Sequence, residues 1–254
     1  WFTTDRSLGE KAAVFSIPDL WLSSGWMPIP DKMFFTGSRD MKRIDASRLL
    51  SEHEKFWADT VPGLKKAASA RTPIVPLVAA NLLRHTSLVA NNLGVTLADL
   101  GRTNDAFTAY AKAREILPDN LSALLNQYSL IKAGYKTDSS AAIEKEFNQL
   151  MESKKDDPQF FLRPLSRYFG YVRTPDAFAN YGWAWALSGS PTLAVAGMKK
   201  AIDLSADKTD RQKQTLAFFY LMQNQEAESE ALYRELAANN EDSGTPYLGL
   251  ARVA

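Results

Sequence analysis

From residue 71 onward, apolar residues recur at intervals of three and four positions, the spacing that gathers side chains on one face of a helix. The pattern is clearest in residues 90–118. There Leu93 and Leu97 share one face of a first helix, while the small residues Gly94 and Ala106 allow a second helix to pack closely against it. The pattern therefore predicts two antiparallel helices joined by a short turn.

This stretch resembles the signature of the tetratricopeptide repeat (TPR) family. The matching elements are Ala90-x-x-Leu93-Gly94-x-x-Leu97, then Ala106-x-x-x-Tyr110, and finally Pro118. A single unit of this kind cannot bury its own apolar face, so the resemblance implies a stack of units about 34 residues long. We therefore expect an all-α fold, a right-handed α-solenoid of helix hairpins.

The unit recurs at this period along the chain. We expect repeats at residues 87–120, 121–153 in degenerate form, 175–208 and 210–243, with a half repeat at 244–254 and an inserted helix at 157–172. In the degenerate repeat, bulky Tyr128 stands where a small residue belongs. Asn224 takes the place that Gly101 and Gly189 hold between the paired helices, and asparagine accepts a left-handed conformation better than most residues.

Several helix starts are marked independently of the repeat pattern. In each of them a capping oxygen precedes a proline, and a proline at the first helical position costs no hydrogen bond. These starts are Asp157-Pro158, Thr174-Pro175, Ser190-Pro191 and Thr245-Pro246.

Residues 1–70 differ in kind from the rest. The apolar runs 12–15 and 33–35 are predicted to be extended segments within an irregular N-terminal cap. A helix is expected to start at Asp45 as its N-cap and to be interrupted at 61–63, where the sequence is Val-Pro-Gly. We therefore expect an N-terminal segment with a leading helix at 1–70, and a solenoid at 71–254, entered by a long helix near Pro76.

The two ends of the chain suggest a piece of a longer protein. The first residue is not methionine, and the last predicted helix has no partner in the half repeat. The alternative is a processed, mature chain whose last helix is a true cap, since solenoids require caps.

Composition excludes several function classes. The formal net charge is +1 and lysine pairs such as Lys154-Lys155 are isolated, so we expect no nucleic-acid partner. Apolar runs are too short to span a bilayer, so this chain is not expected to insert into a membrane. The absence of cysteine removes disulfides, thiolate metal sites and cysteine nucleophiles, and we expect no metal and no cofactor.

The catalytic inventory is also small. The chain has two histidines, His53 and His85, and each is spaced from neighbouring leucines as a helix packing residue would be. Phosphate-binding loops, GxSxG and HExxH are absent from the sequence. We therefore do not expect an enzyme. The alternative, a free-standing enzyme that uses acids and the two histidines, would need His53 or His85 in an open pocket with a carboxylate within hydrogen-bonding reach.

The TPR resemblance implies a concave groove lined by the first helix of each repeat. Matching by repeat phase gives the residues that would contact a ligand: Asn91, Val95 and Ala98, then Ala179 and Trp183, then Gln214 and Phe218. The groove implied is apolar and aromatic. Val95 stands where the carboxylate-gripping members of the family need a polar side chain, so a carboxylate clamp is not expected. The alternative for Trp183 and Phe218 is a place in the core between helices.

A second resemblance concerns the N-terminal region. Residues 16–21, Ile44-Asp45 and His53-x-x-Phe56-Trp57, followed directly by helical repeats, look similar to the soluble tails of bacterial multi-spanning membrane proteins of the protein O-mannosyltransferase type. This resemblance implies an extracytoplasmic location, in the periplasm or cell envelope, tethered by membrane segments that lie outside this chain. The alternative is a cytoplasmic location.

Two functions of different kinds follow. The leading one is a non-catalytic scaffold that binds a peptide or a partner protein along the groove. The alternative is an accessory extracytoplasmic domain of a membrane glycosyltransferase-like protein, which would contact an acceptor protein or glycan. An N-terminal group of large side chains could serve as a sugar platform or simply hold the cap together. Its members are Trp1, Trp21, Trp26, Phe34 and Phe35.

Overall fold

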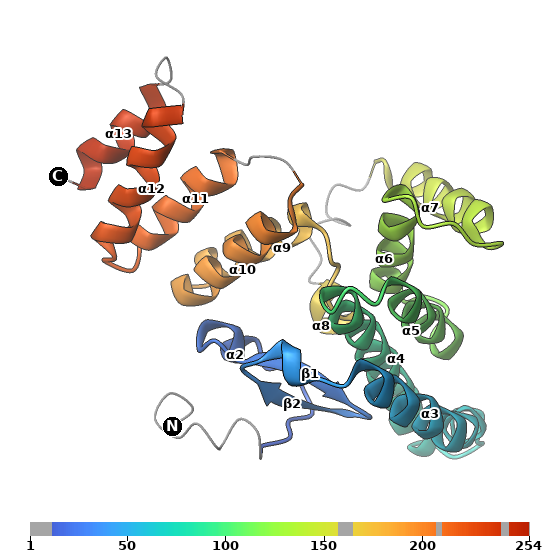
Figure 1. Cartoon of the computed structure of the whole chain (residues 1–254). Coiled ribbons are helices and arrows are strands. Elements are labelled where there is room, and N and C mark those ends of the chain that lie inside the picture. Colours follow the sequence, from blue (N-terminus) through green and yellow to red (C-terminus); the bar gives the residue numbers. More distant parts are fainter. Residues whose placement is uncertain (1–11, 157–164, 207–209, 240–243, 254) are drawn as a thin grey trace. The chain divides into compact units, whose positions relative to one another are not determined.

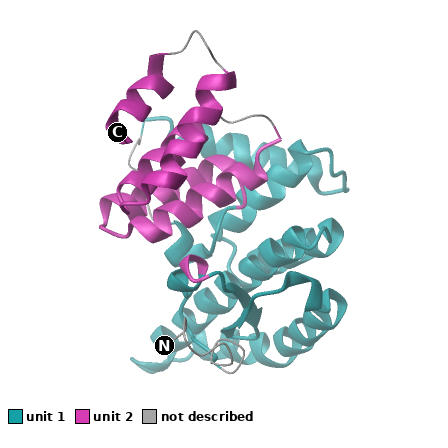
Figure 2. Ribbon diagram, turned by 60° about the vertical axis from the view of Figure 1, so that its left-hand side comes forward, with its two compact units in different colours: residues 1–21, 25–172 teal, residues 22–24, 173–254 magenta. Residues whose placement is uncertain are grey.

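The structure is a computed structural model that describes residues 12–156, 165–206, 210–239 and 244–253 (Figure 1). The chain divides into two compact units (Figure 2). Unit 1 comprises residues 1–21 and 25–172, and unit 2 comprises residues 22–24 and 173–254. The expected boundary at residue 70 does not separate these units, because the helix before it packs against the helices that follow.

The described residues are mostly helical, as expected, and contain one small two-stranded sheet. Within each unit, successive helices pack against one another as neighbouring pairs. The helices are α2 (Asp19–Ser23), α3 (Ala46–Ala68), α4 (Val75–Asp99), α5 (Thr103–Ile116), α6 (Leu121–Lys132), α7 (Ser140–Lys154), α8 (Leu165–Phe169), α9 (Pro175–Leu187), α10 (Pro191–Leu204), α11 (Asp210–Leu221), α12 (Glu226–Asn239) and α13 (Gly244–Val253), and a short 3-10 helix covers Met41–Arg43.

An antiparallel hairpin forms most of the N-terminal cap. Strand β1 (Met27–Asp31) pairs with β2 (Phe34–Ser38), and Val14 adds a bridge to Phe35. The predicted extended run 12–15 thus supplies Val14, and the predicted run 33–35 supplies the start of β2. Strand β1 was not predicted, because it contains Pro28 and Pro30, and proline cannot donate to a ladder and is confined to sheet edges.

The hairpin packs directly on α4. Phe35 is buried in one cluster with Leu88 and Val89, and Val14 and Ile17 cover its edge. This cluster makes the cap part of unit 1.

Helix α3 starts as predicted but does not break where expected. The side chain of Asp45 accepts a hydrogen bond from the Arg48 amide at 3.0 Å, which confirms the N-cap. The predicted interruption at 61–63 is wrong, because the helix continues through Pro62 to Ala68. Trp57 and Val61 are buried on adjacent turns. Their packing outweighs the single hydrogen bond that a proline removes from a helix.

The paired helices follow the predicted repeats, except that α4 begins at Val75, well before the predicted start at residue 87. Helices α4 and α5, α6 and α7, α9 and α10, and α11 and α12 each pack together, and α13 occupies the last half repeat. The turn between paired helices contains a residue with positive φ at Gly101 (74°), Gly189 (77°) and Asn224 (56°). Asparagine therefore replaces glycine in this turn as the sequence predicted.

The predicted helix starts meet different outcomes. The side chain of Thr174 accepts from the Ala177 amide at 3.2 Å, which confirms this cap. Ser190 occupies the N-cap position of α10, but its side chain makes no capping hydrogen bond. Helix α13 begins at Gly244, so Thr245 lies in its first turn and is not its cap. Asp157 and Pro158 lie outside the described residues. Of the inserted helix predicted over 157–172, the structure describes residues 165–172, where α8 covers Leu165–Phe169 and residues 170–172 are not helical.

Within the described residues, no helix combines the length and apolar character that crossing a membrane would require.

Candidate binding surface

Unit 2 exposes an aromatic pair that comes from two helices. The rings of Trp183 on α9 and Phe218 on α11 have centroids 6.2 Å apart, and 42% and 36% of these residues is exposed. Phe219 lies behind the pair: it is fully buried and meets the Trp183 ring edge to face at 5.0 Å. The buried ring supports the tryptophan and leaves part of both outer rings open to a ligand.

Two aliphatic side chains extend this surface by one helical turn. Leu187 follows Trp183 on α9 and Met222 follows Phe218 just past α11, and they are 85% and 43% exposed. We call these four residues the aromatic face. Large exposed apolar side chains at neighbouring positions of this kind are a feature of interaction sites.

The opposite ends of the same two helices are polar. Asp176 and Asn180 precede Trp183 on α9, and Arg211 and Thr215 hold the equivalent places on α11, 35 positions later. At these positions the two helices therefore change from polar side chains, with Asp176 and Arg211 charged, to apolar ones. Ala179 and Gln214, which were also predicted to face the groove, are half-buried one turn before the aromatic rings.

The site residues predicted in unit 1 lie in a different environment. Asn91 and Val95 are only 0% and 7% exposed, and Ala98 is half-buried. The prediction that Asn91 and Val95 line an open groove is therefore wrong. The residues that follow α8 lie against this part of α4, and Asn91 Nδ2 donates to the Tyr171 carbonyl at 2.9 Å.

Two further asparagines take part in this contact. Asn126 Nδ2 on α6 donates to the same Tyr171 carbonyl at 2.9 Å, and the Tyr171 N–H donates to Asn92 Oδ1 at 2.8 Å. We call Asn91, Asn92 and Asn126 the asparagine cradle. Sequence reasoning missed the last two, although Asn126 stands 35 positions after Asn91 and so repeats its place in the next hairpin.

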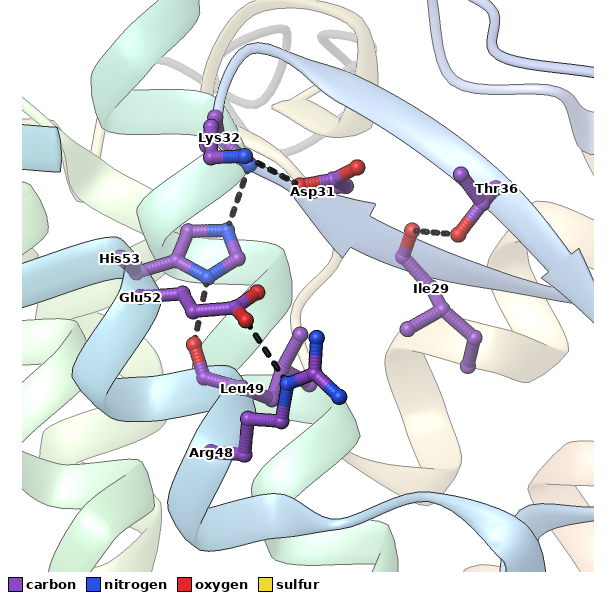
Figure 3. Close-up of polar contacts among 8 residues, drawn as sticks. All are labelled: Ile29, Asp31, Lys32, Thr36, Arg48, Leu49, Glu52 and His53. Atoms are coloured by element: carbon purple, nitrogen blue, oxygen red, sulfur yellow. Dashed lines mark hydrogen bonds and ion pairs between the residues drawn. The ribbon is translucent and has the colours of Figure 1, made fainter.

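His53 links α3 to the turn of the N-terminal hairpin (Figure 3). Its Nδ1–H donates to the Leu49 carbonyl at 2.8 Å, and its Nε2 accepts from the Lys32 N–H at 3.0 Å. These partners fix the neutral ring with its proton on Nδ1. Burial lowers the pKa of His53, because the charged form would be removed from water.

His85 binds the next residue of the same turn from α4. Its Nε2 donates to the Met33 carbonyl at 2.7 Å, and its ring stacks on Phe15 with centroids 3.7 Å apart. Partial burial lowers the pKa of His85. Both histidines of the chain are therefore packing residues, as the sequence predicted, and both hold the turn formed by Lys32 and Met33.

The N-terminal aromatic group does not form an open platform. Trp21, Trp26 and Phe35 are buried, while Phe34 is exposed and Trp1 lies outside the described residues. The buried rings hold the cap together. Across the described ranges, no three histidine, aspartate or glutamate side chains gather as metal ligands would.

Comparison with known proteins finds no protein-family model that matches the chain and no curated protein that matches it significantly. The TPR interpretation accordingly depends on the spacing of residues in the sequence.

Proposed function

We propose that this protein is a non-catalytic scaffold of the tetratricopeptide type, an α-solenoid in which the aromatic face of unit 2 binds an apolar segment of a partner protein. The observation that supports this proposal most directly is the exposed pair of Trp183 and Phe218. These residues occupy the same place in two successive hairpins, and their rings lie side by side at 6.2 Å. Large aromatic side chains with a buried support are the residues that dominate binding energy at protein interfaces.

The neighbours of the pair favour a peptide over a sugar. Leu187 and Met222 extend the surface with side chains that offer no hydroxyl, amide or carboxylate group to a ligand. A sugar covering them would leave its hydroxyl groups without hydrogen-bond partners, which costs free energy on desolvation. Apolar side chains of a peptide incur no such cost.

The polar ends of α9 and α11 define the rest of the partner. Asp176 on α9 and Arg211 on α11 hold the same place in the predicted repeat, and one is acidic while the other is basic. A complementary segment would present apolar side chains to the aromatic face, followed by polar residues of both charges. The partner is therefore an amphipathic segment of a protein.

The test is a selection of 12-residue peptides from a random library on the whole chain, followed by affinity measurements with the labelled peptides. We expect the selected sequences to carry aromatic or aliphatic residues. Their affinity should fall at least tenfold with Trp183→Ala and with Phe218→Ala, consistent with about 1.4 kcal/mol or more for a central aromatic contact. Tyr247→Ala, which removes an exposed aromatic side chain of α13, is the matched control and should leave the affinity unchanged.

Equal affinity for the parent chain and both aromatic variants would contradict the proposal. If, in addition, an oligosaccharide array gave ligands that depend on Trp183, the accessory glycan-contacting function would replace it.

A further inference from the structure

The asparagine cradle holds the backbone of one residue in both directions. Asn91 and Asn126 donate their side-chain amides to the Tyr171 carbonyl, and Asn92 accepts from the Tyr171 N–H, all at 2.8 to 2.9 Å. The three asparagines are almost completely buried, and Asn126 Nδ2 also donates to Asn91 Oδ1 at 2.9 Å. The cradle is thus a polar site built within unit 1.

The contacts are those of peptide-backbone recognition. Three cradle contacts are with the backbone of Tyr171, so the N–H and the C=O of this one residue are both paired. Asn91 and Asn126 come from the first helices of two successive predicted hairpins, 35 positions apart.

Two features determine which peptide fits. A Cβ on Gly170 would lie 2.5 Å from Asn92 Oδ1 and 2.6 Å from Asn91 Nδ2, and the φ of Gly170 is +88°, so glycine is required there. The Tyr171 hydroxyl donates to the carboxylate of Asp19, which selects a tyrosine at the next position.

The present occupant does not use the whole site. Asn92 Nδ2 is buried and has no hydrogen-bond partner in the described part of the chain. The Tyr171 N–H fixes the orientation of this amide, because it requires the Asn92 oxygen on its side. A buried donor without an acceptor is unfavourable, so a peptide that supplies one more carbonyl would bind the cradle better than residues 170–172 do.

We propose that the asparagine cradle is a binding site for an extended peptide with a glycine–tyrosine pair, filled in this structure by the chain's own Gly170 and Tyr171. Covalent attachment gives the internal segment a high effective concentration. A peptide from another molecule therefore binds when the internal segment is displaced. This site belongs to unit 1 and does not depend on the aromatic face, so either proposal can fail without the other.

The test uses the full chain and a labelled, blocked peptide with the sequence of residues 168–173 (Tyr-Phe-Gly-Tyr-Val-Arg). Gly170→Ala displaces the internal segment and leaves the three asparagines intact. We expect this variant to bind the peptide at least tenfold more tightly than the parent chain. Adding Asn126→Leu should abolish the binding. A peptide with alanine in place of its glycine is the control and should not bind.

A folded Gly170→Ala chain that binds neither peptide would overturn the proposal. If that variant does not fold, amide hydrogen exchange of the parent chain decides. We expect the Tyr171 amide to exchange faster than the amides of α4, and faster still with millimolar peptide. The proposal would be overturned if the Tyr171 amide exchanged at the rate of the α4 amides and the peptide left that rate unchanged. Such a result would show that the contact opens only when the protein unfolds.

Discussion

The ring of Tyr110 lies directly over Gly94, so that a Cβ at this glycine would come within 2.4 Å of the tyrosine Cε1. Tyr110 is buried, and Gly94→Ala should lower the free energy of unfolding by about 1 to 3 kcal/mol through overpacking. Gly63→Ala is the matched control. Gly63 also lies inside a helix, but no atom stands within 4 Å of its added Cβ, so this change should raise stability by about 0.5 to 1 kcal/mol. Urea unfolding followed by circular dichroism measures both. Equal losses in the two variants would contradict the close pairing of α4 and α5.

Two rings in contact, Phe219 on α11 and Trp183 on α9, should differ sharply in their effect on stability. Phe219 is fully buried, and Phe219→Ala should cost about 3 to 5 kcal/mol. Trp183 keeps part of its surface in water, and Trp183→Ala should cost about 1 kcal/mol or less. Chemical unfolding of each variant measures its free energy of unfolding, and the two losses can then be compared. A large loss with Trp183→Ala would place this tryptophan in the core and remove the basis for the aromatic face.

Stability should depend on pH through the two histidines. Burial lowers the pKa of His53 and of His85 below the ordinary value of about 6.5, so the folded chain binds fewer protons than the unfolded chain as the medium becomes acidic. Their contribution is therefore complete above about pH 6.5 and is lost as the pH falls below it. Thermal unfolding between about pH 5.5 and 7.5 measures the effect.

The two rings should respond differently to protonation. A proton on Nε2 of His53 would face the Lys32 N–H and break that hydrogen bond, whereas Nε2 of His85 already donates to Met33 and keeps its bond. Desolvation is the largest influence on the pKa of His53, and it lowers that pKa. The Asp31 and Glu52 charges raise the pKa, and the Lys32 charge lowers it. His53→Gln should therefore flatten the pH dependence more than His85→Gln does. The reverse order would contradict this arrangement.

Asn224 adopts a left-handed conformation with φ of 56° between α11 and α12. Asn224→Ala should destabilise unit 2 by about 1 to 2 kcal/mol. Residues that carry a Cβ atom but no short polar side chain avoid the left-handed conformation. Asn224→Gly is the control, and it should be neutral or slightly stabilising. Thermal unfolding of the parent chain and of the two variants gives the order of their stabilities. An alanine variant as stable as the parent would indicate that the turn can rearrange.

Local signals explain why much of the helical layout could be predicted. The caps at Asp45 and Thr174 and the turn residues at Gly189 and Asn224 act on the backbone within a few positions. The chain needs no distant partner to form them. The 35-residue spacing of Trp183 and Phe218 is also visible in the sequence alone, and the two rings lie 6.2 Å apart in the structure.

Distant contacts explain what could not be predicted. Asn91 is buried and its side chain binds the carbonyl of Tyr171, which lies 80 positions away in the sequence. Helix α3 continues through Pro62 because tertiary packing of its buried residues outweighs a local breaking signal. Strand β1 forms despite two prolines because it lies at the edge of a two-stranded sheet. In each case a packing partner overrides the local preference.

Because both histidines are held at the Lys32–Met33 turn, the imidazole resonances of this chain report on one place only. A proton NMR spectrum of the C2–H region contains one signal from each ring. These two signals follow the attachment of the N-terminal hairpin to α3 and to α4 separately, without any label and whatever happens in unit 2.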